Sequence, residues 1–312
     1  MLRYVGKRLL WMIPIIIGVS LIVFFLISMV PGDPATIILG AGADQAQIDA
    51  LNIQLGYYDP FWVRYFRYMK GVIQLDFGTS YVTSLPVIQE LKTKVVISII
   101  VAFSAIIGSL VIGIPLGVLS AVKQYSILDV IPTSLAMIFA AAPSFWVGLM
   151  LILEFSLKHS WLPSFGVEGN YWYILPMLTL SAVYGATMLR FTRSSMLETI
   201  RQDYIRTARA KGASEQVVIW RHALKNALLP VITAAGNTFG ALLGGAIVTE
   251  TLFSLPGLGT FIVNGIKQKD IPVVMGGTIT LAVLFSFVML AVDLIYAFVD
   301  PRVKAKYAGK RG

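Results

Sequence analysis

The sequence of 312 residues contains no cysteine, which excludes disulfides, thiolate metal sites and cysteine nucleophiles. Charged residues are scarce, at 13% of the chain against roughly 25% in soluble domains. Histidine occurs only as His159 and His222, and neither lies in an H-E-x-x-H helix or near a carboxylate cluster. No phosphate-binding loop of the form G-x-x-x-x-G-K-S/T is present. We therefore expect no catalytic site, no metal site and no ATP site in this chain.

Apolar residues dominate instead, at 57% of the sequence, which predicts a membrane protein. Six runs approach the ~20 residues that a helix needs to cross ~30 Å of hydrocarbon. The first is longer than the ~7–15 residues of a signal-peptide core, so it is interpreted as an anchored span. The chain is expected to be an all-α membrane protein with six transmembrane helices. The six runs are Leu9–Val30, Val95–Ala121, Val130–Leu157, Tyr173–Arg190, Ala227–Val248 and Ile271–Val299.

The basic residues predict the orientation of these spans. The net charge of +9 is compatible with nucleic-acid binding, but loops on the cytoplasmic side of a membrane protein give the same bias. With the N-terminus inside, most of the 25 Lys and Arg residues fall on the cytoplasmic side, including those of the tail after residue 299. Both termini are therefore predicted to be cytoplasmic, with membrane lipid and no nucleic acid as a partner.

The segment 31–94 is predicted to be an external loop, and its length requires short helices of its own. Asp44 is expected to cap a helix that ends at Gly56, and Asp59 with Pro60 to begin the next helix. Aromatic residues in this second helix suit a membrane interface, and a binding surface is the alternative. They are Phe61, Trp62, Tyr65, Phe66 and Tyr68.

Small residues and prolines within the spans indicate packing and bending. Glycines at 236, 240 and 244 share one helix face and permit close helix packing (Gly236, Gly240, Gly244). Pro115 in "GIPLG" and Pro143 in "AAPSFW" each permit a bend that is useful for gating.

Charges within apolar segments are few. Glu154 and Asp293 lie inside spans and Glu250 lies near a span end, whereas an ion relay needs several such groups stacked in depth. An ion-coupled carrier is therefore the weaker interpretation. The gate or pore candidates are Pro143, Ser144, Asn237 and Glu250.

The stretch from Tyr204 to Pro230 is unusually basic for a chain of this kind. Asp203 is a suitable N-cap for a helix ending before Gly212, and Ser214 a suitable start for a second helix. Along the second helix an apolar stripe is expected from Val217, Trp220, Leu224, Leu228 and Val231. Such a hairpin can rest on anionic lipid, act as a nucleic-acid-binding helix-turn-helix, or dock a soluble partner that transmits force.

A family resemblance reorders these interpretations. "DYIRTARAKG" followed by "HALKNALLPV" resembles the cytoplasmic loop of permease subunits in bacterial binding-protein-dependent ABC importers. Arg206, Thr207 and Ala208 take the E-A-A positions of that motif, Gly212 takes its glycine, and 222–225 take the I-x-L-P positions. Where these residues differ from the common motif, they resemble the dipeptide, oligopeptide, glutathione and nickel branch of the family. Four other segments resemble the same branch, so the similarity covers nearly the whole chain: "PGDPA", "FTRSSMLE", "TETLFSLPGLG" and "KDIPVVMGG".

The resemblance implies a type I importer permease fold in the bacterial cytoplasmic (inner) membrane, with 1–312 as one permease domain. The loop 191–229 would contain a coupling helix that contacts an ATPase subunit, with ATP-Mg bound by that partner, and its basic residues would face acidic rims. The implied partners are a homologous second permease, two ATPase subunits and an extracytoplasmic substrate-binding protein. The substrate would be a short peptide, or alternatively nickel chelate or glutathione. The coupling residues would be Asp203, Tyr204, Arg206, Thr207, Ala208, Arg209, Lys211, Gly212 and Ala213. The binding-protein contacts would be Pro256, Gly257 and Gly259, besides the loop 31–94.

Overall fold

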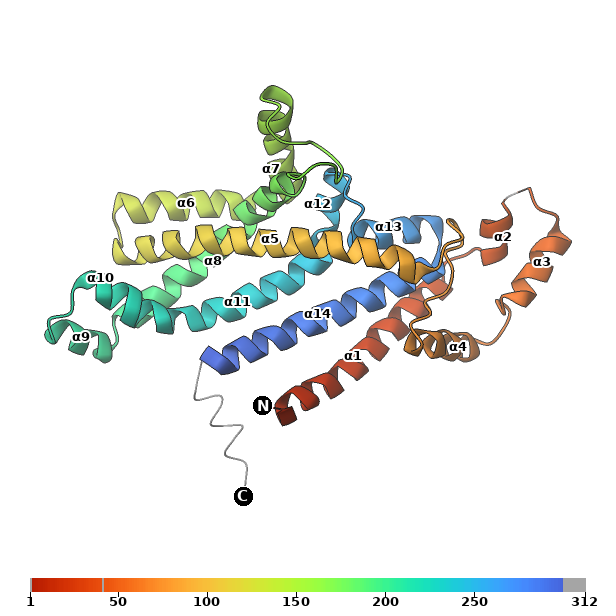
Figure 1. Ribbon diagram of the computed structural model, residues 1–312, viewed down its shortest axis with the longest axis horizontal. Coiled ribbons are helices and arrows are strands. Elements are labelled where there is room, and N and C mark those ends of the chain that lie inside the picture. Colours follow the sequence, from red (N-terminus) through yellow and green to blue (C-terminus); the bar gives the residue numbers. More distant parts are fainter. Residues whose placement is uncertain (1, 41, 300–312) are drawn as a thin grey trace, which may run out of the picture. The chain divides into compact units, whose positions relative to one another are not determined.

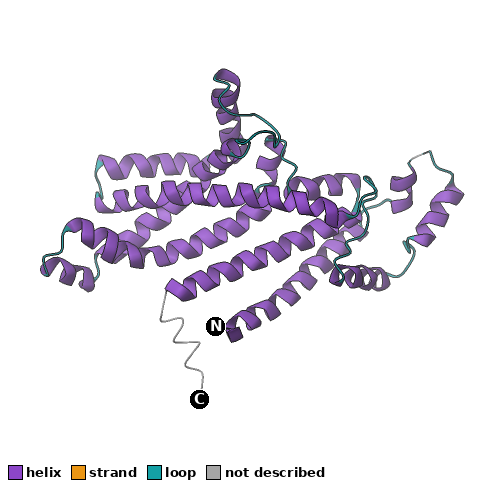
Figure 2. Cartoon of the chain, in the orientation of Figure 1, coloured by secondary structure: helices purple, strands orange, loops and turns teal. Residues whose placement is uncertain are grey.

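The computed structural model describes residues 2–40 and 42–299, in which helices and loops are present and no strand occurs (Figure 2). The basic tail that was predicted to be cytoplasmic lies outside the described residues; it contains Arg302, Lys304, Lys306, Lys310 and Arg311. The chain divides into two compact units. One unit is built on Ile99–Leu255, with the last helix from Phe287, and the other on Val5–Ser98 and Pro256–Ser286. A single domain over 1–312 stays a prediction.

The unit built on Val5–Ser98 contains most of the N-terminal helices (Figure 1). Its elements are α1 (Leu2–Ser28), α2 (Pro34–Leu39), α3 (Gln45–Gln54), α4 (Phe61–Ile73) and α13 (Leu258–Gln268), with the first parts of α5 (Val87–Val122) and α14 (Ile271–Val299). The other unit contains the rest of α5 and α14. Its own elements are α6 (Ile127–Ala141), α7 (Ser144–Leu151), the π-helix η1 (Ile152–Lys158), α8 (Ile174–Ile200), α9 (Asp203–Ala210), α10 (Glu215–Val217), the π-helix η2 (Val218–Ala223), α11 (Leu224–Gly245) and α12 (Ile247–Leu252).

The predicted spans correspond to long apolar helices, with one exception. Five helices among the described residues are long and apolar enough to cross a membrane. The run Val130–Leu157, predicted as one span in which Pro143 permits a bend, is two helical segments, Ile127–Ala141 and Ser144–Lys158, bent by 106°. Counted as one broken span, this pair gives the sixth.

Proline chemistry explains that break. Ala142 has φ −72° and ψ 133°, the extended conformation that a following proline imposes on its neighbour. Pro143 is itself extended and directly precedes α7, so the helix stops and restarts in a new direction. Pro115, by contrast, is accommodated inside the single helix α5. The bend that the sequence permitted at both prolines occurs as a break only at Pro143.

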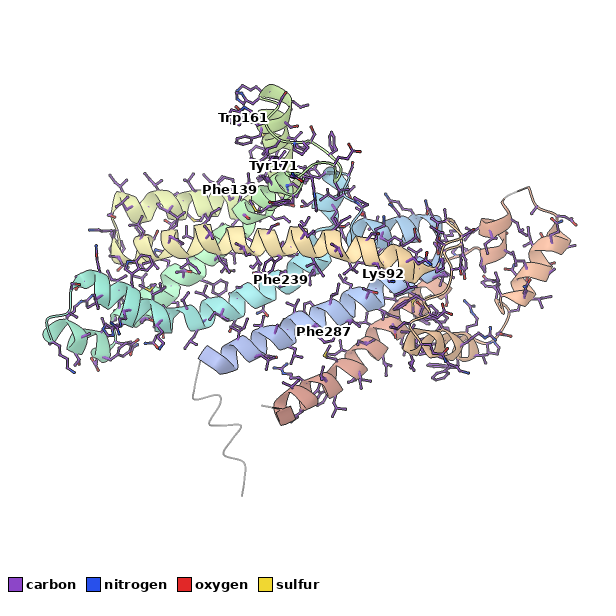
Figure 3. The ribbon with its side chains drawn as sticks, in the orientation of Figure 1. Lys92, Phe139, Trp161, Tyr171, Phe239 and Phe287 are labelled. Carbon is purple, nitrogen blue, oxygen red and sulfur yellow. The ribbon has the colours of Figure 1, made fainter. Side chains whose placement is uncertain are left out.

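Glycines on either side of Pro115 bring α5 against α8. A Cβ on Gly113 would lie 2.5 Å from Met188 Cβ, and one on Gly117 would lie 2.6 Å from Thr192 Cβ. Neither distance is possible for real side chains, so only glycine permits this approach. Helix α8 is the most enclosed of the candidate spans, and α6, α7 and α11 also pack against it. Phe239 of α11, labelled in Figure 3, lies edge-on to Phe103 of α5 with ring centroids 6.3 Å apart.

The short helices of segment 31–94 are present, with changed details. Asp44 does precede α3, but its side chain makes no capping hydrogen bond. Pro60, not Asp59, is the N-cap of α4, and the Asp59 carboxylate instead forms an ion pair with Arg67, more than two helical turns further along the chain. The aromatic side chains of α4 divide between two environments: Tyr65 is buried against Phe24 of α1, whereas others remain exposed. The exposed ones are Trp62 and Phe66.

Candidate functional site

The residues Asp203–Ala223, here called the basic hairpin, comprise α9, α10 and η2 and lie at one end of their unit beyond α8 and α11 (Figure 1). Gln202, not the predicted Asp203, is the N-cap of α9, and Asp203 is the first helical residue. The helix ends as the sequence predicts, with Gly212 in the left-handed conformation at φ +82°. The amide of Gly212 donates to Arg209 O at 2.9 Å, and the amide of Ala213 donates to Ala208 O at 3.3 Å. This pair of bonds is the Schellman arrangement, which stops a helix sharply and fixes the direction of the exit.

An apolar cluster holds the basic hairpin to the long helices. Ile205 of α9 is fully buried, and it packs with residues from the end of α5, from α8 and from the following helix. Ala208 and Ala213 lie partly buried against the same cluster. The buried members besides Ile205 are Val118, Ala121, Met196, Val218, Ala223 and Ala227. The hairpin therefore has a fixed base and an exposed outer face.

The predicted apolar stripe on the second helix is wrong at its start, whereas its later members Leu224, Leu228 and Val231 are half-buried or buried. Trp220 is 54% exposed and Val217 is 41% exposed, while Val218 and Ala223 are fully buried. The reason is the π-helix η2, whose wider turn places residues five apart on one face instead of three or four. The buried positions then continue along α11 at Ala227 and Val231.

The charged residues of the basic hairpin are partly engaged with one another. Arg209 Nε lies 2.7 Å from Glu215 Oε1, in an ion pair that bridges the two arms. Arg206 Nη1 lies 3.6 Å from Asp203 Oδ1, and both side chains are highly exposed. The guanidinium of Arg209 thus has an internal carboxylate in this structure, and the expectation that it faces an acidic partner stays a prediction.

The remaining predicted coupling residues lie on the outer surface. Lys211 and Thr207 are exposed, and the Thr207 hydroxyl donates to Asp203 O at 3.0 Å. Tyr204 is 45% exposed, and Asn226 of α11 donates to its hydroxyl at 3.0 Å. Apart from its two chain neighbours, no heavy atom of the described residues lies within 4 Å of a Cβ built on Gly212, so that side of the turn is open.

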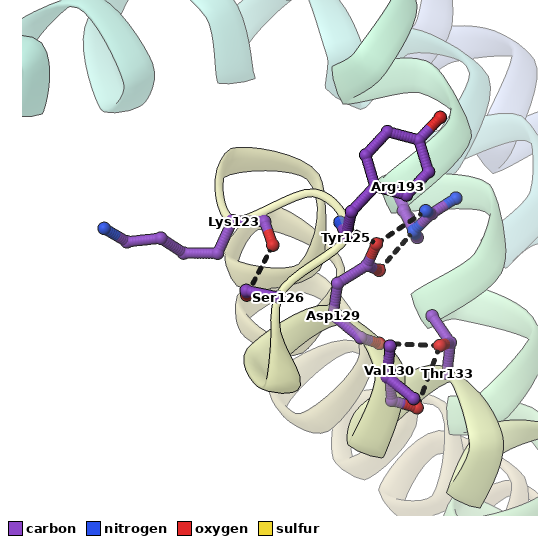
Figure 4. A network of polar contacts seen from close by, with 7 residues as sticks. All are labelled: Lys123, Tyr125, Ser126, Asp129, Val130, Thr133 and Arg193. Carbon is purple, nitrogen blue, oxygen red and sulfur yellow. Dashed lines mark hydrogen bonds and ion pairs between the residues drawn. The ribbon is translucent and has the colours of Figure 1, made fainter.

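Sequence reasoning missed a buried ion pair behind the hairpin. Asp129 of α6 is 4% exposed, and Arg193 of α8 donates to it from Nε at 2.7 Å and from Nη2 at 2.9 Å (Figure 4). The Tyr125 amide also donates to Asp129 Oδ2 at 3.0 Å, which fixes the turn before α6. The two-bond fork gives both strength and a defined orientation. The isolated acidic residue in an apolar run was the available sequence signal.

The gate candidates fall on different elements. Pro143 and Ser144 lie at the break before α7, with Pro143 exposed and Ser144 half-buried. Glu250 lies on α12, only 1% exposed, and α12 packs against α7, where Leu252 would meet a Cβ on Gly148 at 2.5 Å. Asn237 lies on an exposed face of α11. The structure brings the helices of Ser144 and Glu250 together, and the gate role stays a prediction.

The other charged and small residues have individual surroundings. Glu154 is exposed and accepts from Lys158 Nζ at 2.9 Å, with His159 Nε2 at 3.1 Å. A Cβ on Gly236 would lie 2.3 Å from Val292 of α14, so this glycine permits close helix packing. Gly240 is buried and Gly244 half-buried on the same helix.

The candidate binding-protein contacts belong to the unit built on Val5–Ser98. Gly257 is the N-cap of α13, and the amide of Leu258 donates to Ser98 Oγ at 2.7 Å. Pro256 and Gly257 line a polar hollow, whereas Gly259 is buried. Charged and amide side chains share that hollow, namely Glu90, Lys94, Asn264 and Gln268. Among the described residues, no group of three or more metal-binding side chains is close enough to hold a metal ion.

Comparisons with known proteins cover nearly the whole chain. Residues 113–305 match the family model "binding-protein-dependent transport system inner membrane component", and residues 1–102 match its N-terminal companion. A dipeptide transport system permease, DppB of Alkalihalophilus pseudofirmus, is 40% identical over 97% of this chain and 100% of the relative. The glutathione permease GsiC of Salmonella paratyphi A is 39% identical over 98% and 100%. The fold also resembles the methionine ABC transporter MetNI in inward-facing conformations, with a TM-score of 0.58 at 21% identity over 68% of this chain and 97% of that chain.

Proposed function

The chain belongs to the family of binding-protein-dependent transport inner membrane components, and from this premise we propose that it moves short peptides inward, driven by ATPase subunits that dock on the basic hairpin. It is a multi-pass protein of the cytoplasmic membrane and a transport subunit of an ABC importer of the dipeptide and glutathione type, not an enzyme. The family assignment replaces the ion-coupled carrier that the sequence left open.

The observation that carries the coupling proposal is the construction of the basic hairpin. Helix α9 is short, ends at a left-handed glycine, and presents Tyr204, Arg206 and Lys211 on its outer face. Its inner face is fixed by Ile205 in the apolar cluster that includes residues of α5, α8 and α11. A push on α9 is therefore transmitted to several long helices at once, because a close-packed cluster deforms little.

The division of labour follows from this arrangement. Partner ATPase subunits would bind ATP-Mg, and their closure would displace α9. A homologous second permease would complete the translocation path, and an extracytoplasmic binding protein would deliver the substrate. Lys211 and Arg206 would meet an acidic groove most readily, since the Arg206–Asp203 pair is long, at 3.6 Å, and highly exposed, whereas Arg209 lies 2.7 Å from Glu215. A short peptide is proposed as substrate from the dipeptide relative, with glutathione, itself a short peptide, and nickel chelates as the alternatives.

Gly212→Val tests the coupling proposal. Valine at φ +82° is strained by about 1–2 kcal/mol and adds bulk on the open side of the turn. Gly169→Val is the matched control, because Gly169 has φ +78° and equally open surroundings but lies outside the basic hairpin. Co-purification of the ATPase and ATP-dependent uptake are measured in the same preparations. We expect a loss of at least tenfold in Gly212→Val alone. Normal assembly and uptake in that variant would contradict the proposal and favour the lipid-surface interpretation.

A further inference from the structure

A pocket in the unit built on Val5–Ser98 has no role in the coupling proposal. It encloses about 500 Å³, within the range of small-molecule sites. The walls come from α1, α2, the segment between α3 and α4, α4 itself, the loop after α4 and the start of α14. Apolar residues such as Phe24 and Phe77 form part of the wall. The polar side chains are Tyr57, Arg64, Arg67, Tyr68, Asp76, Thr79, Ser80, Tyr81 and Ser84.

Arg64 is the most informative residue of this pocket. Its guanidinium carbon lies 5.1 Å from the centroid of the Tyr57 ring and 5.7 Å from that of Phe24, so two aromatic faces hold it. The one side-chain hydrogen bond it makes among the described residues is from Nη1 to Tyr57 O, at 3.3 Å. No described carboxylate pairs with it. A guanidinium has five N–H donors in a fork that suits a carboxylate, so most of this binding capacity is unused.

An opposite charge lines the same pocket. Asp76 accepts from the Gly78 amide at 2.9 Å through Oδ1, and no described cation forms an ion pair with it. Arg67, the second arginine of the pocket, is already paired with Asp59. The pocket is therefore lined by a half-buried cation, Arg64, and an exposed anion, Asp76, which form no ion pair with each other or with another described residue. A ligand with separated opposite charges is the chemical complement of such a pair.

The tyrosines add neutral donors. Burial raises the pKa of Tyr81 to about 12, and burial likewise raises the pKa of Tyr68 far above its ordinary value. Both phenols thus keep their protons throughout the physiological range. The Tyr68 hydroxyl is buried and has no hydrogen-bond partner among the described residues. Leaving a buried hydroxyl unsatisfied is costly, so an acceptor supplied by a ligand is favourable here.

We propose that this pocket binds a small zwitterion, such as a free amino acid or a short peptide, with its carboxylate on Arg64 and its ammonium group at Asp76. None of the residues that line this pocket belongs to the basic hairpin. The inference rests on the proposed function only in the choice of a dipeptide as the probe. The alternative is that Arg64 has only a structural role, in which its contact with the Phe24 ring stabilises the packing of α4 on α1. The experiment must distinguish this role from ligand binding.

The experiment measures binding to the purified full-length chain in lipid nanodiscs by calorimetry and by saturation-transfer NMR. The probes are alanyl-alanine, its N-acetyl form, its C-terminal amide, the doubly capped form, and acetate. The variants are Arg64→Gln, Arg64→Lys and Asp76→Asn. Lys70→Gln is the matched control for arginine, because Lys70 is exposed on α4 and does not line the pocket. Asp44→Asn is the control for aspartate, since Asp44 is exposed and makes no capping bond.

We expect saturable binding of alanyl-alanine, at least tenfold weaker binding of each singly capped form, and none of the doubly capped form. Arg64→Gln should weaken the dipeptide at least tenfold while leaving the residual affinity for the amide unchanged. Arg64→Lys keeps the positive charge and should therefore bind the dipeptide more tightly than Arg64→Gln does. If Arg64 served only to stack on Phe24, two variants with the same melting temperature should bind the dipeptide equally. Absence of dipeptide binding, equal affinity for capped forms, or acetate binding as tightly as the dipeptide would each overturn the proposal. No ATPase is present, so failure here leaves the coupling proposal standing.

Discussion

The basic hairpin and the segment 31–58 are both built from short helices, but different forces hold them in place. Ile205 anchors the hairpin in an apolar cluster, with its charges on the outside. Helices α2 and α3 are instead joined by polar groups: the fully buried Asn52 accepts from the Ala35 amide at 3.2 Å and donates to Asp33 Oδ1 at 2.8 Å. Apolar burial is nearly independent of pH and salt, whereas polar contacts depend on protonation. The two regions should therefore fail under different conditions.

The largest effect is expected at the ion pair behind the hairpin. Arg193→Met leaves the buried Asp129 carboxylate without its partner, which costs about 3–5 kcal/mol. The double variant Arg193→Met with Asp129→Leu should regain most of that loss, because no charge is then left buried. Thermal unfolding in detergent and ATPase coupling measure both. A double variant as unstable as the single one would show that the carboxylate is not the cause.

Removing the apolar anchor should come next. Ile205→Ala deletes buried atoms and is expected to cost about 2–5 kcal/mol, with a cavity left in the cluster. The conservative change Ile205→Val should cost about 0.5–1.5 kcal/mol. Protease cleavage within 203–223 reports the detachment of the hairpin. An equal rate of cleavage in the unaltered protein, Ile205→Val and Ile205→Ala would mean that Ile205 does not anchor the basic hairpin.

Removing the hydrogen bonds of Asn52, which join α2 to α3, should have a smaller and local effect on stability. Asn52→Leu removes an acceptor from the Ala35 amide and a donor from Asp33, at about 1–3 kcal/mol. Hydrogen exchange should rise in α2 and α3 while exchange in the basic hairpin stays unchanged. Gln54→Leu, on the exposed end of the same helix, is the control and should leave exchange in α2 unaltered.

The smallest effect is the pH response of the same contact. Burial acts to raise the pKa of Asp33, but hydrogen bonds from Asn52 and from Thr36 outweigh it, so the pKa lies below 3.8. A carboxyl group with a depressed folded pKa contributes stability above its unfolded pKa, about 3.9, and loses it as pH falls through the folded value. The protection of α2 and α3 against exchange, relative to the intrinsic exchange rate at each pH, should therefore be constant from pH 7 to about pH 5 and fall only below about pH 4. Asp33→Asn should remove that dependence, and a transition near neutral pH would contradict it.

Local chemistry explains which parts of the fold the sequence predicts. Gly212 and Ser214 bound the two arms of the basic hairpin because a left-handed position and an N-cap each have a strong residue preference. The family motif also includes Gly212. Long apolar runs predicted the long helices for a similarly direct reason, since length and hydropathy are read without knowledge of partners.

The rest depends on partners distant in sequence or on departures from α-helical geometry. Asp129 and Arg193 are 64 residues apart, and nothing in either neighbourhood indicates the other. Trp220 was placed on the buried face because helical spacing assumes 3.6 residues per turn, which fails across η2. Pro115 and Pro143 look alike in sequence, yet one is accommodated and the other breaks the span. The sequence gives no signal for a pocket at Arg64, because the pocket is formed by segments that come together only in the folded chain.

The number of residues in the π-helix η2 determines how α9 is rotated about the axis of α11. Each residue of an α-helix advances the chain by about 100° around the axis, and a π turn contains one residue more than an α turn over the same rise. Deleting one residue from 218–223 would let an ordinary α-helix form there. Everything on the N-terminal side, including α9, would then be turned by about 100° about the axis of α11. A single codon thus sets the direction in which α9 meets whatever binds it.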